Sequence, residues 1–409
     1  MKIKISHNSR TDIKLFGIIA IYILSPLVGY DDIYLHMSMI LLVSLVVYVN
    51  RKDSTIPFDV YAIALFLLFI LIIYIFISIV YLGNKFSVSL IQYFIQVFAY
   101  LLFAGSVNWL FAAPNRDIAF FIKIFSLVAV LNSIVIIAEA FSPFVHNVIE
   151  GFLGQRAEKL VYATNIEKFR GFATSSGANL SFYNGLSIIM LTWLYTIRRV
   201  NLSFFLISIF ILFVALLWIG RTGFFVSIIG IFLVLSTQIK ASLKNIIIIM
   251  LVFYLIVQFI IFFGDRYFDA YHFKYLFGFM LEGYSGLIQE RSVADLLENH
   301  YKFPTNFWMI LFGNGNYSGN FGHSNSDPGI IRMISAVGLP VTLSFYLIII
   351  LLIYKYLKFT ISLPIILITV FIIAEFKEPF ILKGYSAREL WFLIGYSAFD
   401  QMRKLKYEI

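Results

Sequence analysis

A succession of long, nearly uncharged apolar runs constrains this chain more than any other feature of its sequence. A helix needs roughly 20 apolar residues to cross the hydrocarbon core of a bilayer, and runs of that order follow one another from residue 15 to residue 400. They are continuous rather than short and alternating, which excludes a transmembrane β-barrel. The chain is 61% hydrophobic and 13% charged, with a mean hydropathy of +0.90, far from the composition of a soluble domain. The sequence predicts an all-α polytopic membrane protein.

We expect about 12 transmembrane helices, at roughly 20 residues each, in one membrane domain over residues 1–409. The predicted spans are residues 15–30, 33–49, 59–82, 88–111, 119–141, 178–197, 202–219, 222–239, 245–263, 329–354, 359–376 and 387–400. Lys and Arg residues collect in alternate connections, such as Arg51-Lys52 and Arg198-Arg199, and at both termini. Because such residues favour the cytoplasmic side, both termini are predicted to be cytoplasmic. The same bias explains the net charge of +9 without a nucleic-acid partner.

Two longer segments, residues 142–177 and 264–328, then fall on the outer side, which is the periplasm in a cell with two membranes. The second is the longest interval without a membrane-length apolar run, and its Gly313-Asn314-Gly315 sequence predicts a turn. A polar loop of this size between membrane helices is where we expect chemistry. Internal symmetry of the kind found in inverted-repeat transporters is not visible in the sequence.

Three arginines are predicted near the outer face: Arg170, Arg221 and Arg291. Arg221 has glycines close by on both sides, at Gly220 and Gly223, and apolar runs beyond them. Such an arginine is costly unless it faces a cavity or a partner. Its planar guanidinium suits phosphate and diphosphate oxygens. We interpret the three arginines as a shared anion site; the alternative is that each side chain snorkels to lipid headgroups.

The acidic residues leave more than one interpretation. Glu375, Lys377 and Glu378 form either a structural ion-pair cluster or a group that transfers a proton and holds substrate. Asp327 and His323 precede the next apolar run, and either could deprotonate a sugar hydroxyl. Asp327 also fits an ordinary turn or helix cap.

No metal or cofactor is predicted. The chain has no cysteine, its six histidines are scattered, and no metal-ligand spacing occurs. A phosphate-binding glycine loop is also absent, since no Lys and Ser or Thr follow the Gly313 turn.

From residue 165 onward the chain resembles the Wzy-type bacterial O-antigen polymerases, in a superfamily that also contains the O-antigen ligases. The similar motifs, in chain order, are Arg-Gly-Phe at 170–172, Gly-Arg-Thr-Gly at 220–223, Arg291, Phe-Gly-Asn-Gly at 312–315, Ser-Asp-x-Gly at 326–329, Ile331-Arg332, Val-Gly-Leu at 337–339 and Phe-Lys-Glu-Pro-Phe at 376–380. Their order and topological positions carry the resemblance.

The resemblance implies an inverting, metal-independent glycosyltransferase of GT-C-like architecture in the bacterial inner membrane, with short helices in its large outer loop and its active site facing the periplasm. The donor would be a growing glycan on undecaprenyl diphosphate, and the acceptor one new lipid-linked repeat unit. Asp327, Glu378 and His323 would be the catalytic residues. Substrate would be held by Arg170, Arg221, Arg291, Arg332, Lys377 and Glu375. A flippase and a chain-length regulator of the same pathway would be partners, together with the lipid bilayer.

Two other functions compete with this one. In the ligases a histidine lies eleven positions before a glycine, but the residue eleven positions before Gly338 is Asp327, which favours a polymerase. Some polymerases also place a glycine eleven positions after each loop arginine; here Ser181 follows Arg170 at that spacing and Lys302 follows Arg291, so that motif is not met. A flippase would need charges along a central path. Glu139 is the main charge inside a predicted span, either as a satisfied helix-end residue or as a contact to lipid headgroups.

Overall fold

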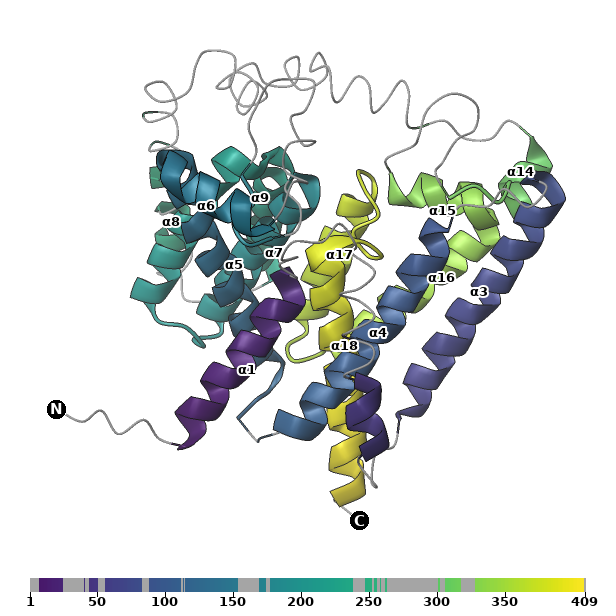
Figure 1. Ribbon diagram of the computed structural model, residues 1–409, viewed down its shortest axis with the longest axis horizontal. Coiled ribbons are helices and arrows are strands. Elements are labelled where there is room, and N and C mark those ends of the chain that lie inside the picture. Colours follow the sequence, from purple (N-terminus) through teal and green to yellow (C-terminus); the bar gives the residue numbers. More distant parts are fainter. Residues whose placement is uncertain are drawn as a thin grey trace. The chain divides into compact units, whose positions relative to one another are not determined.

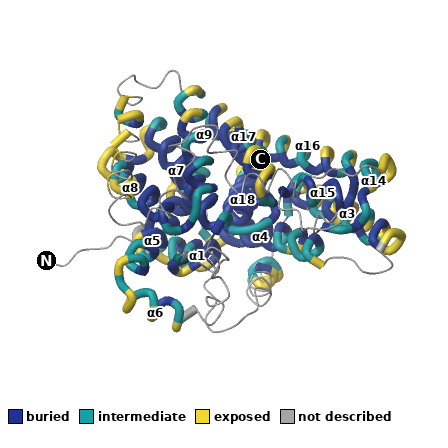
Figure 2. Tube along the Cα trace, turned by 90° about the horizontal axis from the view of Figure 1, so that it is seen from above, coloured by how far each residue is buried: buried dark blue, intermediate teal, exposed yellow. Residues whose placement is uncertain are grey.

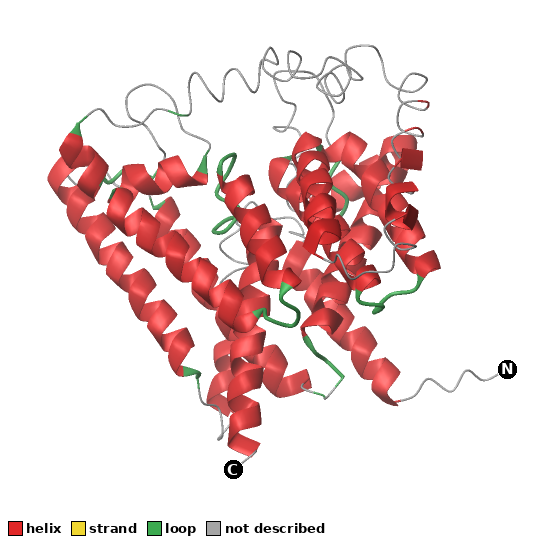
Figure 3. Ribbon diagram, turned by 180° about the vertical axis from the view of Figure 1, so that it is seen from behind, coloured by secondary structure: helices red, strands yellow, loops and turns green. Residues whose placement is uncertain are grey.

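The computed structural model describes residues 7–24, 40, 44–50, 56–82, 88–111, 113, 115–153, 169–173, 177–237, 247–251, 254–255, 258, 262, 301, 306–317 and 328–407. Within these ranges the chain forms helices joined by turns, and no β-strand occurs (Figure 3). The prediction of an all-helical protein is confirmed. Arg291, His323 and Asp327 lie outside the described residues.

Five helices in the described part of the chain are long and apolar enough to cross a membrane. They are α3 (Phe58–Leu82), α4 (Ser89–Phe111), α5 (Ile118–Phe141), α8 (Leu202–Ile219) and α16 (Leu339–Tyr356) (Figure 1). Two shorter apolar helices are α9 (Arg221–Thr237) and α17 (Ser362–Glu375). The chain is therefore a multi-pass helical membrane protein. The full set of 12 spans stays a prediction, because the predicted spans 33–49 and 245–263 lie largely outside the described residues.

The chain divides into two compact units, and the first comprises residues 1–43 and 107–276. It contains α1 (His7–Leu24), α5, α6 (Pro143–Leu153), α7 (Ala178–Thr196), α8 and α9. Helix α7 is its centre, since it packs against α5, α8 and α9, and every side chain from Leu180 to Tyr195 is buried (Figure 2). Because these residues of α7 pack against other helices, a polar side chain there can find a protein partner. The Asn184 amide donates to the Ser133 hydroxyl at 2.8 Å.

Glycines bring α7 and α9 into backbone contact. A Cβ atom on Gly223 would lie 1.8 Å from the carbonyl oxygen of Ser181, and one on Gly185 would lie 2.4 Å from the carbonyl oxygen of Gly223. Small residues at these positions let two membrane helices approach closely. This contact fixes where α9 begins.

One end of the first unit carries ion pairs. Arg199, just beyond the end of α7, pairs with Asp117 at 2.8 Å, and Asp117 caps the start of α5. Arg116 pairs with Asp12 of α1 at 2.8 Å. These arginines belong to connections that the charge bias assigns to the cytoplasm.

The second unit comprises residues 44–106 and 277–409. It contains α3, most of α4, α14 (Phe307–Phe312), α15 (Gly329–Val337), α16, α17 and α18 (Gly384–Tyr407). The span predicted over residues 329–354 is present as α16, but its predicted start is wrong, because the chain breaks between α15 and α16 at Gly338. Gly338 has φ of +81°, and a Cβ atom there would lie 2.1 Å from the Leu311 carbonyl oxygen. Hydropathy does not register such a break, since apolar residues continue on both sides.

The Gly313-Asn314-Gly315 turn ties together three elements of this unit. Gly313 and Gly315 have φ of +76° and +74°. The Asn314 backbone N–H donates to the Ser335 carbonyl of α15 at 2.7 Å, and the Ser78 hydroxyl of α3 donates to the Gly315 carbonyl at 2.9 Å. The predicted turn is thus confirmed, and it positions α14 against α15 and α3.

Candidate functional site

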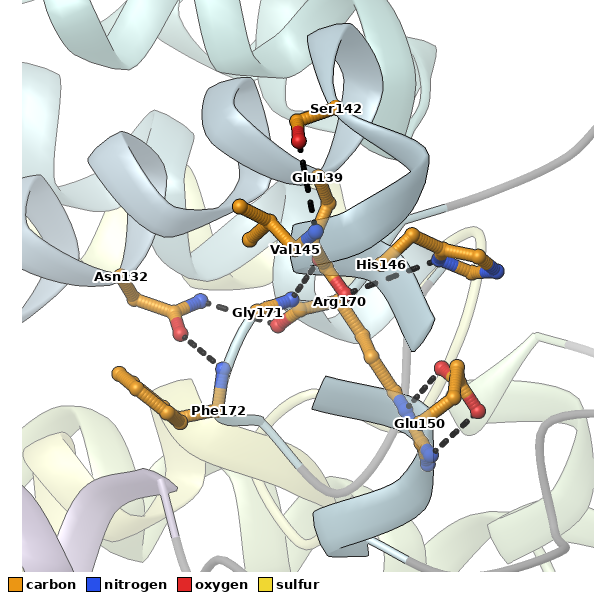
Figure 4. A network of polar contacts seen from close by, with 9 residues as sticks. All are labelled: Asn132, Glu139, Ser142, Val145, His146, Glu150, Arg170, Gly171 and Phe172. Atoms are coloured by element: carbon orange, nitrogen blue, oxygen red, sulfur yellow. Dashed lines mark hydrogen bonds and ion pairs between the residues drawn. The ribbon is translucent and has the colours of Figure 1, made fainter. Parts of the chain in front are cut away.

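Arg170 lies at the end of the first unit away from Arg116 and Arg199, in the short described segment before α7. Its side chain is 4% exposed, and it forms a two-point pair with Glu150 of α6 (Figure 4). Nε donates to Oε1 at 3.2 Å and Nη2 donates to Oε2 at 3.1 Å. A guanidinium buried to this degree requires such a partner. Glu150 therefore compensates the charge of the Arg170 guanidinium and holds its plane in one orientation.

The backbone of the Arg-Gly-Phe motif is held by two polar residues of α5 (Figure 4). The Gly171 N–H donates to Glu139 Oε2 at 2.7 Å, and the Phe172 N–H donates to Asn132 Oδ1 at 2.8 Å. The Asn132 amide in turn donates to the Arg170 carbonyl at 3.2 Å. Gly171 has φ of +59°, and a Cβ atom there would lie 2.5 Å from Asn132 Oδ1. Glycine is required here, because any side chain would displace the α5 anchor.

Glu139 is 2% exposed, which argues against a contact to lipid headgroups, and its Oε2 accepts the Gly171 N–H. Its second oxygen, Oε1, lies 3.9 Å from His146 Nδ1 on α6. His146 also packs edge-on against Phe169, with ring centroids 5.5 Å apart.

Arg221 is the first residue of α9 and directly follows Gly220, which has φ of +149°. Ser181, in the first turn of α7, caps this helix start from outside. Its hydroxyl donates to the Gly220 carbonyl at 2.5 Å and accepts from the Gly223 N–H at 2.8 Å. An N-capping hydroxyl normally comes from the helix itself. The half-buried Arg221 side chain thus lies beside a helix N-terminus whose dipole adds positive charge.

Arg170 and Arg221 lie at the same end of the first unit. The Arg170 segment is anchored to the C-terminal half of α5, and Arg221 is anchored through Ser181 to the first turn of α7. These two parts of α5 and α7 are neighbours, since Asn184 bonds to Ser133. Glu150, His146, Asn132 and the capping role of Ser181 were not predicted from the sequence. The spacing of four between His146 and Glu150 on one helical face was a usable signal for the first two.

In the second unit, the Glu375 carboxylate is buried and fully engaged. Oε2 accepts from the Tyr346 hydroxyl at 2.6 Å, and Oε1 accepts from the Ile381 N–H at 2.6 Å. Gly329, the first residue of α15, leaves room for this carboxylate, because a Cβ atom there would lie 2.1 Å from Oε2. Glu375 thus joins α15, α16 and the turn after α17.

Three other residues of this unit were predicted to bind substrate or to act in catalysis: Lys377, Glu378 and Arg332. Lys377 is exposed, and Glu378 and Arg332 are half-buried.

Tyr317 is 1% exposed, and its hydroxyl has no hydrogen-bond partner among the residues that the structure describes. Burial raises the pKa of Tyr317 well above its ordinary value, and the neighbouring Tyr93 and Glu375 add to the rise. Tyr317 therefore stays neutral at physiological pH.

Comparison with known proteins finds no match for this chain. No family model matches the chain, and neither a curated protein nor a solved structure gives a significant match.

Proposed function

We propose that the chain is an O-antigen or related polysaccharide polymerase of the bacterial inner membrane, acting at the periplasmic face. The observation that carries the proposal is the placement of Arg170 and Arg221 at one end of the first unit, with Arg116 and Arg199 at the other. The charge bias predicts that the end with Arg116 and Arg199 is cytoplasmic. In that case the end with Arg170 and Arg221 faces outward. Lipid-linked glycans are presented to polymerases on that side.

The proposed reaction transfers the growing glycan from undecaprenyl diphosphate to a new lipid-linked repeat unit. The acceptor hydroxyl oxygen bonds to the anomeric carbon while the bond from that carbon to the diphosphate oxygen breaks, and its electron pair leaves with the diphosphate. Positively charged groups stabilise the charge that develops on this leaving group. Arg170, Arg221 and Arg291 are proposed for that role, with Arg332, Lys377 and Glu375 as further substrate-binding residues. The acceptor proton passes to a base, for which Asp327, Glu378 and His323 are the candidates.

Deletion of the gene in its own host tests the proposal, with lipopolysaccharide then separated by size on a gel. A polymerase predicts loss of the ladder of long glycans and retention of one band of core plus a single repeat unit. Loss of every glycan-bearing band would instead indicate a ligase or a flippase. An unchanged ladder would overturn all three functions.

A further inference from the structure

Two buried atoms beside Arg170 face each other without a hydrogen bond between them. Glu139 Oε1 and His146 Nδ1 are 3.9 Å apart, and neither has a hydrogen-bond partner among the described residues. This separation exceeds the roughly 3.2 Å limit of a good N–H···O bond. Glu139 is only 2% exposed. The Gly171 N–H donates to Oε2 and leaves Oε1 without a donor in the described part of the chain. A buried carboxylate oxygen without a donor is costly, which suggests that a cation belongs between these two atoms.

Glu150 supplies a third donor. It lies one helical turn after His146 on α6, and the three residues each have a ligand atom within 4.8 Å of the others. Both Glu150 oxygens already accept from Arg170, but each carboxylate oxygen has two lone pairs, so the group can still bind a cation. Of the two carboxyl groups in the cluster, only that of Glu150 is paired with an arginine among the described residues. The local charge therefore favours a cation.

We propose that Glu139, His146 and Glu150 form a site for a divalent transition-metal ion of the zinc class. One imidazole with two carboxylates is a donor set that such ions accept. Two ligand atoms of a tetrahedral zinc site lie about 3.3–3.4 Å apart, so the Glu139–His146 separation of 3.9 Å must shorten by roughly half an ångström on binding. The three ligand atoms lie within 4.8 Å of one another, and rotation of the Glu150 side chain can shorten the remaining separations by up to roughly 1.4 Å.

The ion would be structural. It would join the C-terminal end of α5 to α6, the two elements that hold the backbone and the guanidinium of Arg170. The glycan transfer proposed above needs no metal, and the metal site does not depend on that proposal. The competing account is a protonated His146 that pairs with Glu139 alone.

The test measures metal in the purified full-length protein without any glycan substrate. The protein in detergent is stripped with chelator, incubated with Zn²⁺, freed of unbound ion and analysed by mass spectrometry for metal content. About one tightly bound zinc per chain is expected in the wild type, as for a single site. His146→Ala and Glu139→Gln should lose it. Asn147→Ala, on the exposed neighbouring position of α6, should keep it.

A second readout separates loss of the site from loss of the fold. Zn²⁺ should raise the unfolding temperature of the wild type and of Asn147→Ala, because binding to the native state stabilises it, and it should not raise that of His146→Ala. A wild type that retains no zinc overturns the proposal and supports the protonated His146 account. So does a His146→Ala variant that keeps the wild-type amount, since the ion would then be bound elsewhere. Neither result bears on the gel test of polymerisation.

Discussion

At the scale of single residues, two buried charged side chains of the described residues are compensated by specific partners. Arg170 is buried against Glu150, and the buried Glu375 accepts two hydrogen bonds. Removing one partner from such a pair leaves the other without compensation, which is more damaging than the net strength of the pair suggests. Substitutions at these residues therefore report on function and stability together, and each needs a control matched to its chemistry.

The arginines give the first prediction. Arg170→Ala and Arg221→Ala, together with Arg291→Ala, should each reduce polymerisation at least roughly tenfold, as loss of a charge-assisted contact to the leaving group implies. Glycan length on gels measures this, with membrane levels checked by immunoblot. Arg199→Ala serves as the control, because it removes a half-exposed ion pair at the opposite end of the unit, where such pairs contribute about 0–1 kcal/mol. If two of the three variants retain full-length product, the shared anion site is wrong.

Two tyrosines in the second unit give a matched pair. Tyr346→Phe removes the donor to Glu375 and should lower stability by about 1–3 kcal/mol, since a buried acceptor is left unpaired. Tyr317→Phe removes a buried hydroxyl that has no partner in the described part of the chain, so stability should stay the same or rise. Thermal unfolding in detergent compares them. Equal losses in both variants would contradict the assigned bonding.

At the scale of elements, connections between helices are set by backbone packing rather than by loops. Helix α9 starts where Ser181 of α7 caps it, and α16 starts where Gly338 packs against the backbone of α14. In both places a small residue or a glycine lets two backbones meet. These junctions position Arg221 and the end of α15, so a change in them should act on the site at a distance.

Ser181→Ala tests the junction at Arg221. It removes the cap of α9 and should lower stability by about 0.5–2 kcal/mol, and it should reduce polymerisation further than that loss explains, because Arg221 is no longer held. The control is Ser227→Ala, which loses only a bond to the Phe224 carbonyl within α9. Glycan length is measured at matched protein levels. Wild-type ladders from Ser181→Ala would show that the cap does not position Arg221.

Gly338→Ala tests the break between α15 and α16. At φ of +81° with the Leu311 carbonyl only 2.1 Å from the added Cβ atom, we expect a loss of at least about 1 kcal/mol from backbone strain. Gly17→Ala in α1 has no atom within 4 Å of the added Cβ and should instead stabilise its helix by about 0.5–1 kcal/mol. We expect the unfolding temperature to fall in Gly338→Ala and to rise in Gly17→Ala, relative to the wild type. A stable Gly338→Ala variant would mean that the break is not fixed by this contact.

At the scale of the whole molecule, the described helices establish a multi-pass membrane protein, and its sidedness is open to direct measurement. The chain contains no cysteine, so single cysteines can be introduced without removing others. Asn147→Cys, on exposed α6 near Arg170, should react in intact spheroplasts with a membrane-impermeant maleimide. Lys358→Cys, exposed after α16, should react only after the membrane is opened. The reverse pattern would invert the predicted topology and with it the proposed site of action.

The sequence by itself determined the class of protein and the positions of most helices, because helix formation in a bilayer depends on the local length of an apolar run. The sequence also singled out Arg221 as a candidate, because an arginine between glycines and apolar runs is conspicuous, and Arg170 as a second arginine near the predicted outer face. Only the tertiary structure decided what those arginines contact. The partners Glu150, Asn132 and Ser181 lie 20 to 42 residues away along the chain from the groups they hold.

The physical reason is that an apolar run specifies a helix but not which of its faces meets which neighbour. That choice depends on small residues such as Gly185 and Gly223, which decide how closely two backbones approach. It depends equally on positive-φ glycines such as Gly171 and Gly338, whose conformation no hydropathy pattern reveals. Packing of this kind brought Glu139, His146 and Glu150 together, although their spacing along the chain had predicted no metal site.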